Sequence, residues 1–275
     1  MISLEELNEI KEKRKTNLYY EEKEYLQYIF LNSISKYTDD FVFKDGTCLR
    51  ICFGHERASE DLDFSTNLGV EKVKEVVEKC LKDFDFLGIK YETYSLRAYE
   101  GNLRMEVRFE GPLFAGKRAS TNTLKIDFNN GRIKNKIANV IQKLFSDVPL
   151  FTLVVSDEKE ILAEKIRSLT RRAEPRDLYD VWMLLNRGVK IDVNLLFKKL
   201  NEENTSLSKL KFPSKEEYEI TLKNLINYTP HYEQVKTEVS KAINKIKNKK
   251  IKLGRGFANL SENPKDIKIP SSRKV

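Results

Sequence analysis

Two carboxylates separated by a single residue are the feature of this sequence that most suggests chemistry. Asp61 and Asp63 lie in the run DLDFS, downstream of a turn that contains Gly46 and Thr47. On a strand such side chains point the same way, and like charges held close together repel unless a cation lies between them. Hard divalent ions take oxygen ligands, and substrate phosphates complete their coordination. The pair therefore predicts a metal site for phosphoryl transfer.

Asp127, in the run LKIDF, is the natural third carboxylate of such a site. If Ile126 and Phe128 pack into the core, Asp127 faces the open side that Asp61 and Asp63 would use, because strand side chains alternate. A tight turn at a helix start, as expected around 46–47, offers backbone N–H groups to phosphates.

Lys165 stands in the middle of the apolar stripe of a predicted helix. That stripe consists of Ile161, Leu162, Ile166 and Leu169. Such a lysine either extends out to solvent or is a cation aimed into a cleft, at a triphosphate. In the second case we expect its removal to leave the fold intact. Asp177 and Asp180 follow at i and i+3 on the next helix. Asp177 alone could complement the helix dipole, but two acids after Lys165 favour a polar site.

The elements that must position these residues follow from hydrophobic periodicity. They are helices at 2–13, 20–36, 47–53 and 70–84 and strands at 41–44 and 61–65. The segment 88–128 alternates between apolar and polar residues, which indicates an antiparallel sheet built on the first two strands. From 157 to 250 the pattern is helical throughout.

The chain therefore divides into an α+β part and a helical part. We predict an α+β domain over 1–155, an all-helical domain over 156–250 and a basic, flexible tail over 251–275. The run 243–256 contains Lys and Arg but no acidic residue. Such a block is typical of a contact with nucleic acid or another polyanion. A lysine-rich helix end that merely keeps the protein in solution explains it equally well.

Composition limits the classes of protein to consider. The chain has 275 residues, of which 40% are hydrophobic, and this predicts a folded protein with a substantial core. No stretch approaches the roughly 20 apolar residues of a membrane helix. The N-terminal run MISLEELNEIKEKRK lacks the apolar core of a signal peptide. We therefore expect a cytoplasmic protein without a membrane partner.

The three cysteines do not form a convincing site. They are too few and odd in number for a disulfide framework. Cys48, Cys52 and His55 are spaced as zinc ligands could be, but no fourth ligand is evident, and closed zinc sites want four. We interpret both cysteines as small apolar residues on the buried side of a short helix.

Several of these motifs, in this order, resemble a known family. They are Asp45-Gly46-Thr47-Cys48-Leu49-Arg50, then Arg57-Ala58-Ser59-Glu60-Asp61-Leu62-Asp63-Phe64, then Lys165, and finally Arg176-Asp177-Leu178-Tyr179-Asp180. Over about residues 20 to 200 the set is similar to the AbiEii/AbiGii-type nucleotidyltransferase toxins, which include the MenT toxins. Asp45 departs from the pattern, because a glycine is usual there. We expect this carboxylate to alter nucleotide binding.

The resemblance implies a polymerase-β-like nucleotidyltransferase fold, with a mixed sheet and helices followed by a helical domain. It implies transfer of a nucleoside monophosphate from an NTP, with Mg²⁺ as the cofactor and pyrophosphate as the leaving group. The implied metal ligands are Asp61, Asp63 and Asp127. The implied nucleotide-binding residues are Gly46, Thr47, Arg57, Ser59 and Lys165. Lys165 is also implied to be catalytic, with Asp177 and Asp180. The implied acceptor is RNA, in particular the 3′ end of tRNA, and a cognate antitoxin is the implied protein partner.

Two alternatives stay open at this point. The nucleotide could go to a protein side chain or a small molecule, which the identity of the labelled acceptor would reveal. Alternatively, the chain could be a non-catalytic RNA- or partner-binding member of the fold. Such a protein would bind RNA with steep salt dependence, without any dependence on Mg²⁺ or on Asp61.

Overall fold

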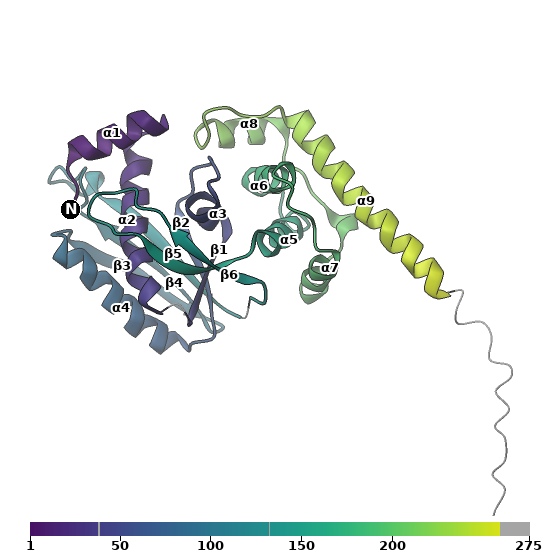
Figure 1. Cartoon of the computed structure of the whole chain (residues 1–275), viewed down its shortest axis with the longest axis horizontal. Coiled ribbons are helices and arrows are strands. Elements are labelled where there is room, and N and C mark those ends of the chain that lie inside the picture. Colours follow the sequence, from purple (N-terminus) through teal and green to yellow (C-terminus); the bar gives the residue numbers. More distant parts are fainter. Residues whose placement is uncertain (38, 132, 259–275) are drawn as a thin grey trace, which may run out of the picture.

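The computed structural model describes residues 1–37, 39–131 and 133–258. Within this part of the chain the strands form one seven-stranded sheet of order β3-β4-β5-β2-β1-β7-β6 (Figure 1). The strands are β1 (Phe41–Lys44), β2 (Asp61–Thr66), β3 (Tyr91–Tyr99), β4 (Asn102–Phe109), β5 (Asn122–Asn130), β6 (Lys136–Ile141) and β7 (Phe151–Ser156). Of these, β6 and β7 were not predicted as strands from the sequence.

The sheet is mixed, as the family resemblance implied. The β3–β4 and β4–β5 pairs are antiparallel, which confirms the expectation for 88–128. β5 joins β2 in parallel, however, and β1 joins β7 in parallel. The prediction that an antiparallel sheet simply extends the first two strands is therefore wrong. Alternation along one strand shows which side chains share a face, but it carries no information on the direction of a distant partner strand.

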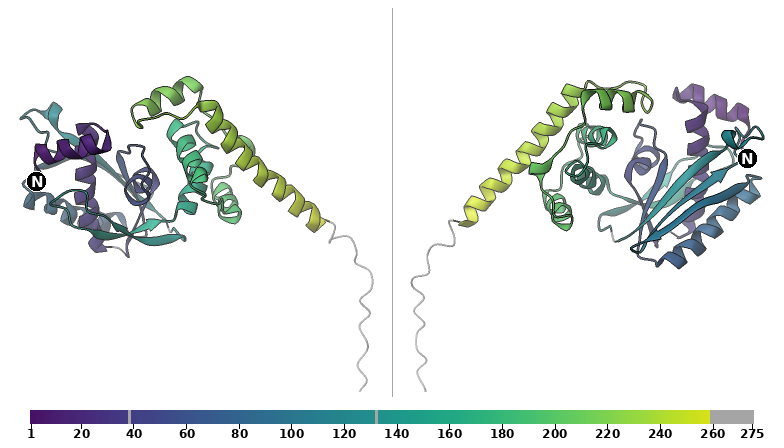
Figure 2. Two further views of the ribbon diagram at one scale, coloured as in Figure 1. Left: turned by 45° about the horizontal axis from the view of Figure 1, so that its top comes forward. Right: turned by 180° about the vertical axis from the view of Figure 1, so that it is seen from behind.

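Helices α2 (Leu18–Ile34) and α4 (Val70–Phe86) pack against the sheet through apolar side chains. The stripe of α4 shows helical spacing and consists of Val73, Val76, Val77, Cys80, Leu81 and Phe84. In both views of Figure 2, α4 runs along the sheet on the side away from the C-terminal helices. On the sheet, the rings of Phe64 and Phe128 stack at a centroid distance of 5.2 Å. This core leaves the polar side chains of the same strands on the opposite face.

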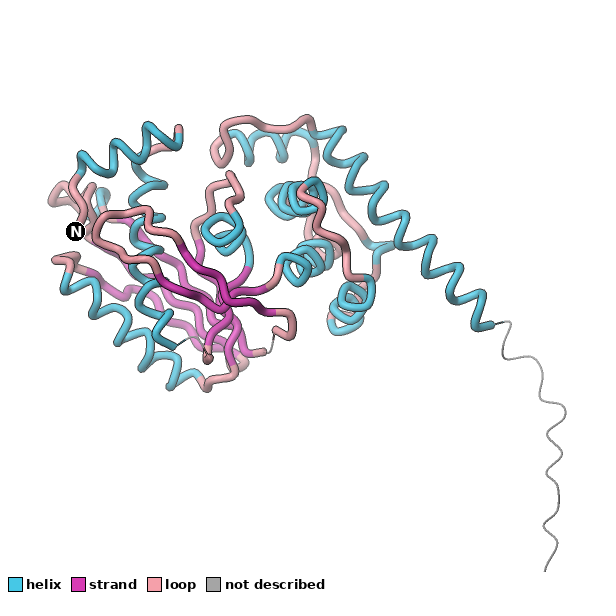
Figure 3. The backbone as a smooth tube through the Cα atoms, in the orientation of Figure 1, coloured by secondary structure: helices cyan, strands magenta, loops and turns pink. Residues whose placement is uncertain are grey.

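After β7 the described chain is helical, as predicted, and Figure 3 shows only helices and loops there. The helices are α5 (Glu158–Ser168), α6 (Pro175–Asn186), α7 (Val193–Glu202), α8 (Lys215–Lys223) and α9 (Tyr232–Ala258). The last of these continues past 250, where we predicted the domain to end. The rest of the predicted tail, 259–275, lies outside the described residues. No described helix is long and apolar enough to cross a membrane.

The two parts of the chain meet at the segment that leads into β2. The Ala58 amide donates to the Leu225 carbonyl at 2.8 Å, beyond the end of α8. The helix that precedes this segment, α3 (Asp45–Phe53), begins directly after β1. In Figure 1, α3 lies between the sheet and helices α5 and α6. The candidate residues are therefore gathered at the junction of the α+β part with the helical part.

Candidate active site

The three candidate carboxylates line one cavity of about 180 Å³. Asp63 on β2 is in register with Asp127 on β5, its parallel neighbour. Ile126 and Phe128 are almost fully buried, so Asp127 is on the strand face opposite the core. The alternation therefore places Asp61, Asp63 and Asp127 on one face, as the sequence predicted.

Asp61 and Asp63 differ from the other acidic groups of the cavity in how they are paired. Neither carboxylate forms an ion pair with another described residue. Burial raises the pKa of Asp61. Burial, together with the neighbouring Asp45 and Asp127 carboxylates, raises the pKa of Asp63 to about 7. Two carboxylates without a direct ion pair are a donor set that suits a divalent cation.

Asp127 differs from the other two because Arg104 of β4 holds it. The guanidinium donates through Nε at 2.7 Å and through Nη2 at 3.0 Å, one bond to each carboxylate oxygen. Among the described residues no group of three His, Cys, Asp or Glu side chains is gathered closely enough to hold a metal ion. Asp61 and Asp63 thus fit a divalent cation as they stand, whereas Asp127 would have to exchange Arg104 for it.

The start of α3 supplies backbone donors and is packed tightly against the segment before β2. The buried Thr47 hydroxyl lies 2.9 Å from Ser59 Oγ and also reaches the Asp61 carbonyl. A Cβ at Gly46 would lie 2.6 Å from Arg57 Nη2 and 2.9 Å from Ser59 Oγ, so only glycine fits. No side chain caps this helix, which leaves its first N–H groups available to an anion.

Lys165 of α5 is only 5% exposed and does not extend to solvent. Its ammonium pairs with Asp45 and lies 3.0 Å from Asp177 Oδ1 and 3.5 Å from Asp180 Oδ2. Burial disfavours the charged ammonium, but these carboxylates raise the pKa of Lys165 above its ordinary value. Of the two alternatives for this lysine, the structure agrees with the one that turns it inward.

Asp45 is the residue that departs from the family pattern. It adopts a φ of +67°, a left-handed conformation that favours glycine. Burial favours its neutral form, but Lys165 and Lys44 hold the pKa of the Asp45 carboxyl well below its usual range. The substitution thus places a fixed negative charge on Lys165 and beside Asp63.

The remaining predicted site residues, Arg57, Asp177 and Asp180, are engaged in hydrogen-bonded ion pairs with other residues of the site. The buried Arg57 donates to both oxygens of Asp180, through Nε and Nη2, each at 2.9 Å. Asp177 accepts from Lys165 and, at 2.8 Å, from Arg172 Nε. Arg57 therefore lies at the cavity wall with its guanidinium already engaged. Asp177 and Asp180 form the polar site that was expected beside Lys165.

Sequence reasoning missed several side chains that line the same cavity. They are Arg104, Arg172 and Glu174, together with Arg176, which belongs to the family motif but was given no role. Arg104 lies opposite Asp127 in the β4–β5 register; its position on the polar face of an alternating strand was a usable signal. Of the described residues, six acidic and five basic side chains line the cavity. A triphosphate would therefore need additional cations to bind there.

Cys48 and Cys52 belong to the packing of α3. Cys48 is buried and Cys52 is half-buried, in agreement with the apolar interpretation. His55 is 3% exposed, and neither of its ring nitrogens has a hydrogen-bond partner among the described residues. Burial lowers the pKa of His55 to about 4, and the nearby Arg187 adds to this.

Comparison with solved structures shows the same fold in several proteins. The MenT4 nucleotidyltransferase toxin of Mycobacterium tuberculosis H37Rv aligns with a TM-score of 0.65 and 20% identity, over 88% of this chain and 89% of that one. JHP933 from Helicobacter pylori aligns with a TM-score of 0.55 and 18% identity, over 95% and 100% of the two chains. A putative nucleotidyltransferase from H. pylori aligns with a TM-score of 0.54 and 17% identity, over 84% and 96%.

No curated protein matches the sequence. The family described as "Nucleotidyl transferase AbiEii toxin, Type IV TA system" matches residues 29–249, which is most of the chain and includes every candidate site residue. This confirms the resemblance that the ordered motifs indicated. The chain belongs to the AbiEii family of nucleotidyltransferase toxins of type IV toxin–antitoxin systems.

Proposed function

We propose that this protein is a Mg²⁺-dependent nucleotidyltransferase that moves a nucleoside monophosphate from an NTP to RNA, with the 3′ end of tRNA as the expected acceptor. The observation that carries the proposal is the row of carboxylates formed by Asp63 and Asp127 in register, with Asp61 on the same face. Membership of a family of type IV toxin–antitoxin systems also implies a cognate antitoxin as a partner. NTPs and tRNA are both cytoplasmic, so we place the activity in the cytoplasm.

In the proposed reaction the acceptor hydroxyl oxygen forms a bond to the α-phosphorus of the NTP. The bond from that phosphorus to the bridging oxygen breaks, pyrophosphate leaves, and the hydroxyl proton passes to solvent. Mg²⁺ bound by Asp61 and Asp63, with Asp127 as a third ligand, would supply charge neutralisation on the phosphates and activate the hydroxyl.

The protein's own groups position the phosphates. Asp45 and Gly46, at the start of α3, line the same cavity, and the N–H groups of this uncapped first turn around Gly46 and Thr47 suit phosphate oxygens. Ser59 Oγ lies beside them as a further hydrogen-bonding group. Lys165 offsets negative charge at the cavity wall, and Asp177 and Asp180 hold it in place from α6. The Arg57 guanidinium holds the Asp180 carboxylate through two hydrogen bonds and packs closely against Gly46.

RNA is favoured over a small cationic acceptor by the charge of the chain. The net charge is +8, and a basic protein attracts polyanions. A small cationic acceptor would call for an acidic pocket. The non-catalytic alternative is supported by Asp45, because its carboxylate already forms an ion pair with the Lys165 ammonium that would otherwise face the triphosphate.

The test is to incubate the full chain with each labelled NTP in turn, Mg²⁺ and a cell extract that contains RNA, protein and small metabolites. We expect the label in the RNA fraction, dependence on Mg²⁺, and loss of labelling in Asp61→Asn. Label in protein or in a small molecule would identify a different acceptor. RNA binding without any labelling would identify the non-catalytic alternative.

A further inference from the structure

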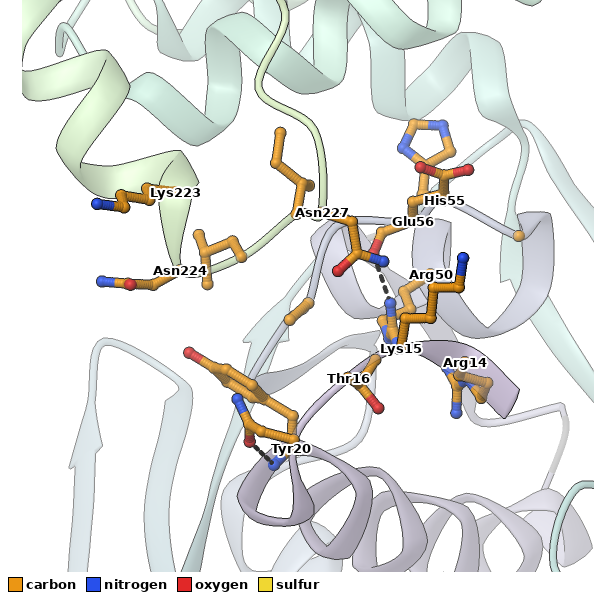
Figure 4. A pocket seen from close by; sticks show the side chains of 15 residues that line it. Arg14, Lys15, Thr16, Tyr20, Arg50, His55, Glu56, Lys223, Asn224 and Asn227 are labelled. Atoms are coloured by element: carbon orange, nitrogen blue, oxygen red, sulfur yellow. Dashed lines mark hydrogen bonds between the residues drawn. The ribbon is translucent and has the colours of Figure 1, made fainter. Parts of the chain in front are cut away.

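A second, larger cavity of about 820 Å³ lies between the N-terminal helices and the end of α8. Figure 4 shows Lys223 and Asn224 on one side of it and Arg14, Lys15 and Arg50 on the other. Helix α1 (Leu4–Arg14) and the start of α2 contribute one wall, and the segment after α8 contributes the opposite wall. The volume is in the range of sites that hold a nucleotide-sized group or more.

The basic groups of this cavity divide into structural and free ones, and its one acidic lining residue among those described is the exposed Glu56. Arg14 pairs with Glu21 and Glu24, both at 2.9 Å, and Arg50 pairs with Glu24 at 2.7 Å, so these arginines hold the wall together. Lys15 and Lys223 are exposed, and neither has a carboxylate partner among the described residues. Two lysines left free on facing walls are suited to an extended polyanion that passes between them.

The same cavity offers an aromatic ring and amides. Tyr20 is half-buried in its lining, and Asn17, Asn224 and Asn227 are its amide residues. Single-stranded nucleic acid is bound by this combination of cations along the backbone and aromatic rings that stack on bases. The centre of a protein–protein interface is instead depleted of charged residues.

The cavity adjoins the carboxylate site. Ala58 lines the large cavity, and Ser59, the next residue, lines the carboxylate cavity. Tyr20 lies close enough to Glu60 and Arg176 for their charges to affect its pKa, and Arg176 also lines the carboxylate cavity. A strand held in the large cavity would thus have one end directed toward Asp61.

We infer that the large cavity, defined by Lys15, Tyr20, Lys223 and the amides around them, binds the single-stranded end of the RNA acceptor. Phosphates contact the two lysines and a base stacks on Tyr20. This inference rests on the proposed function for the reason why RNA is bound, but it concerns a surface separate from the carboxylates. It can therefore be tested without NTP and without catalysis.

The experiment measures binding of the full chain to a short fluorescent single-stranded RNA, by anisotropy, over a series of salt concentrations. The double variant Lys15→Ala/Lys223→Ala is compared with Lys79→Ala/Lys82→Ala. These two control lysines are exposed on α4, away from the cavity, and form no ion pair with a described residue. Each phosphate contact contributes about 0.7 to the slope of log K against log salt. We expect the cavity variant to lose about 1.4 from this slope and the control to keep it.

Tyr20 separates stacking from charge. Tyr20→Leu should weaken binding about tenfold without changing the salt slope, and Tyr20→Phe should bind like the parent protein. Equal affinities and slopes for the cavity and control variants would overturn the inference, as would cavity variants that impair only binding of a protein partner. RNA binding at the cavity without nucleotide transfer would contradict the proposed function alone. Transfer that is indifferent to the cavity variants would contradict this inference alone.

Discussion

Removal of the Lys165 ammonium tests how the site is built. In Lys165→Met the side-chain stem stays and the charge goes, so that three carboxylates lose a shared partner. Asp180 keeps Arg57 and Asp177 keeps Arg172. Asp45 has no other ion-pair partner among the described residues. Breaking a buried pair in this way costs about 3–5 kcal/mol.

Because two of the three carboxylates keep a cation, we expect the lower end of that range, about 3 kcal/mol. For a chain of this size that corresponds to a decrease in Tm of about 6–12 °C. This differs from the expectation based on the sequence, that removal of a cation from a cleft leaves the fold intact. The reason is that Lys165, although it borders the cavity, is buried among three carboxylates that it neutralises.

Thermal unfolding followed by circular dichroism measures the change, with Lys159→Met as the matched control. Lys159 is exposed on the same helix and has no ion pair with a described residue, so its replacement should change stability by less than about 0.5 kcal/mol. Asp45→Gly added to Lys165→Met should restore part of the loss, because it removes the stranded carboxylate and relieves the left-handed φ. A Lys165→Met protein as stable as the control would refute the reasoning.

Three further predictions concern single residues. Asp63→Asn should abolish transfer and yet raise the free energy of unfolding by about 1–3 kcal/mol at pH 8 in metal-free buffer. The reason is that the pKa of Asp63, about 7, means that folding disfavours the ionised carboxylate. Urea titration measures the change. The pKa of His55 is lowered to about 4, so the folded protein disfavours its protonated form. The free energy of unfolding should therefore fall as the pH drops from 6.5 through 4, by about 2 kcal/mol at pH 5. His55→Leu should remove that part of the pH dependence. Gly46→Ala should lower the free energy of unfolding by about 1–3 kcal/mol and weaken nucleotide binding, because the new methyl group meets the fixed Arg57 guanidinium. An unchanged Kd for NTP would contradict this.

Local patterns predicted which residues come together but not how they are neutralised. Alternation around Leu62 and Ile126 was enough to place Asp61, Asp63 and Asp127 on one face, since core packing fixes the faces of both strands. The parallel direction of β5 beside β2 could not be obtained in this way, because it depends on the path of the chain through α4 and the β3–β4 hairpin.

The ion-pair partners of the charged site residues could not be predicted from the spacing of residues in the sequence either. Arg57, which the resemblance implied to bind nucleotide, also holds Asp180, which is distant in the chain. Likewise, Asp127 meets Arg104, and Lys165 meets Asp45, only because the sheet and the helical part are folded against each other. Such pairs depend on tertiary contacts that a single sequence does not specify.

The central claim is that the Asp61–Asp63–Asp127 row transfers nucleotide to RNA. The most direct measurement follows α-labelled NTP and released pyrophosphate together, with tRNA, Mg²⁺ and either the parent protein or Asp63→Asn. The proposal predicts one pyrophosphate for each nucleotide attached to tRNA by the parent protein, and neither product from the folded Asp63→Asn variant. Label on tRNA from Asp63→Asn at the parent rate, or tRNA left unlabelled by the parent protein with every NTP, would contradict it.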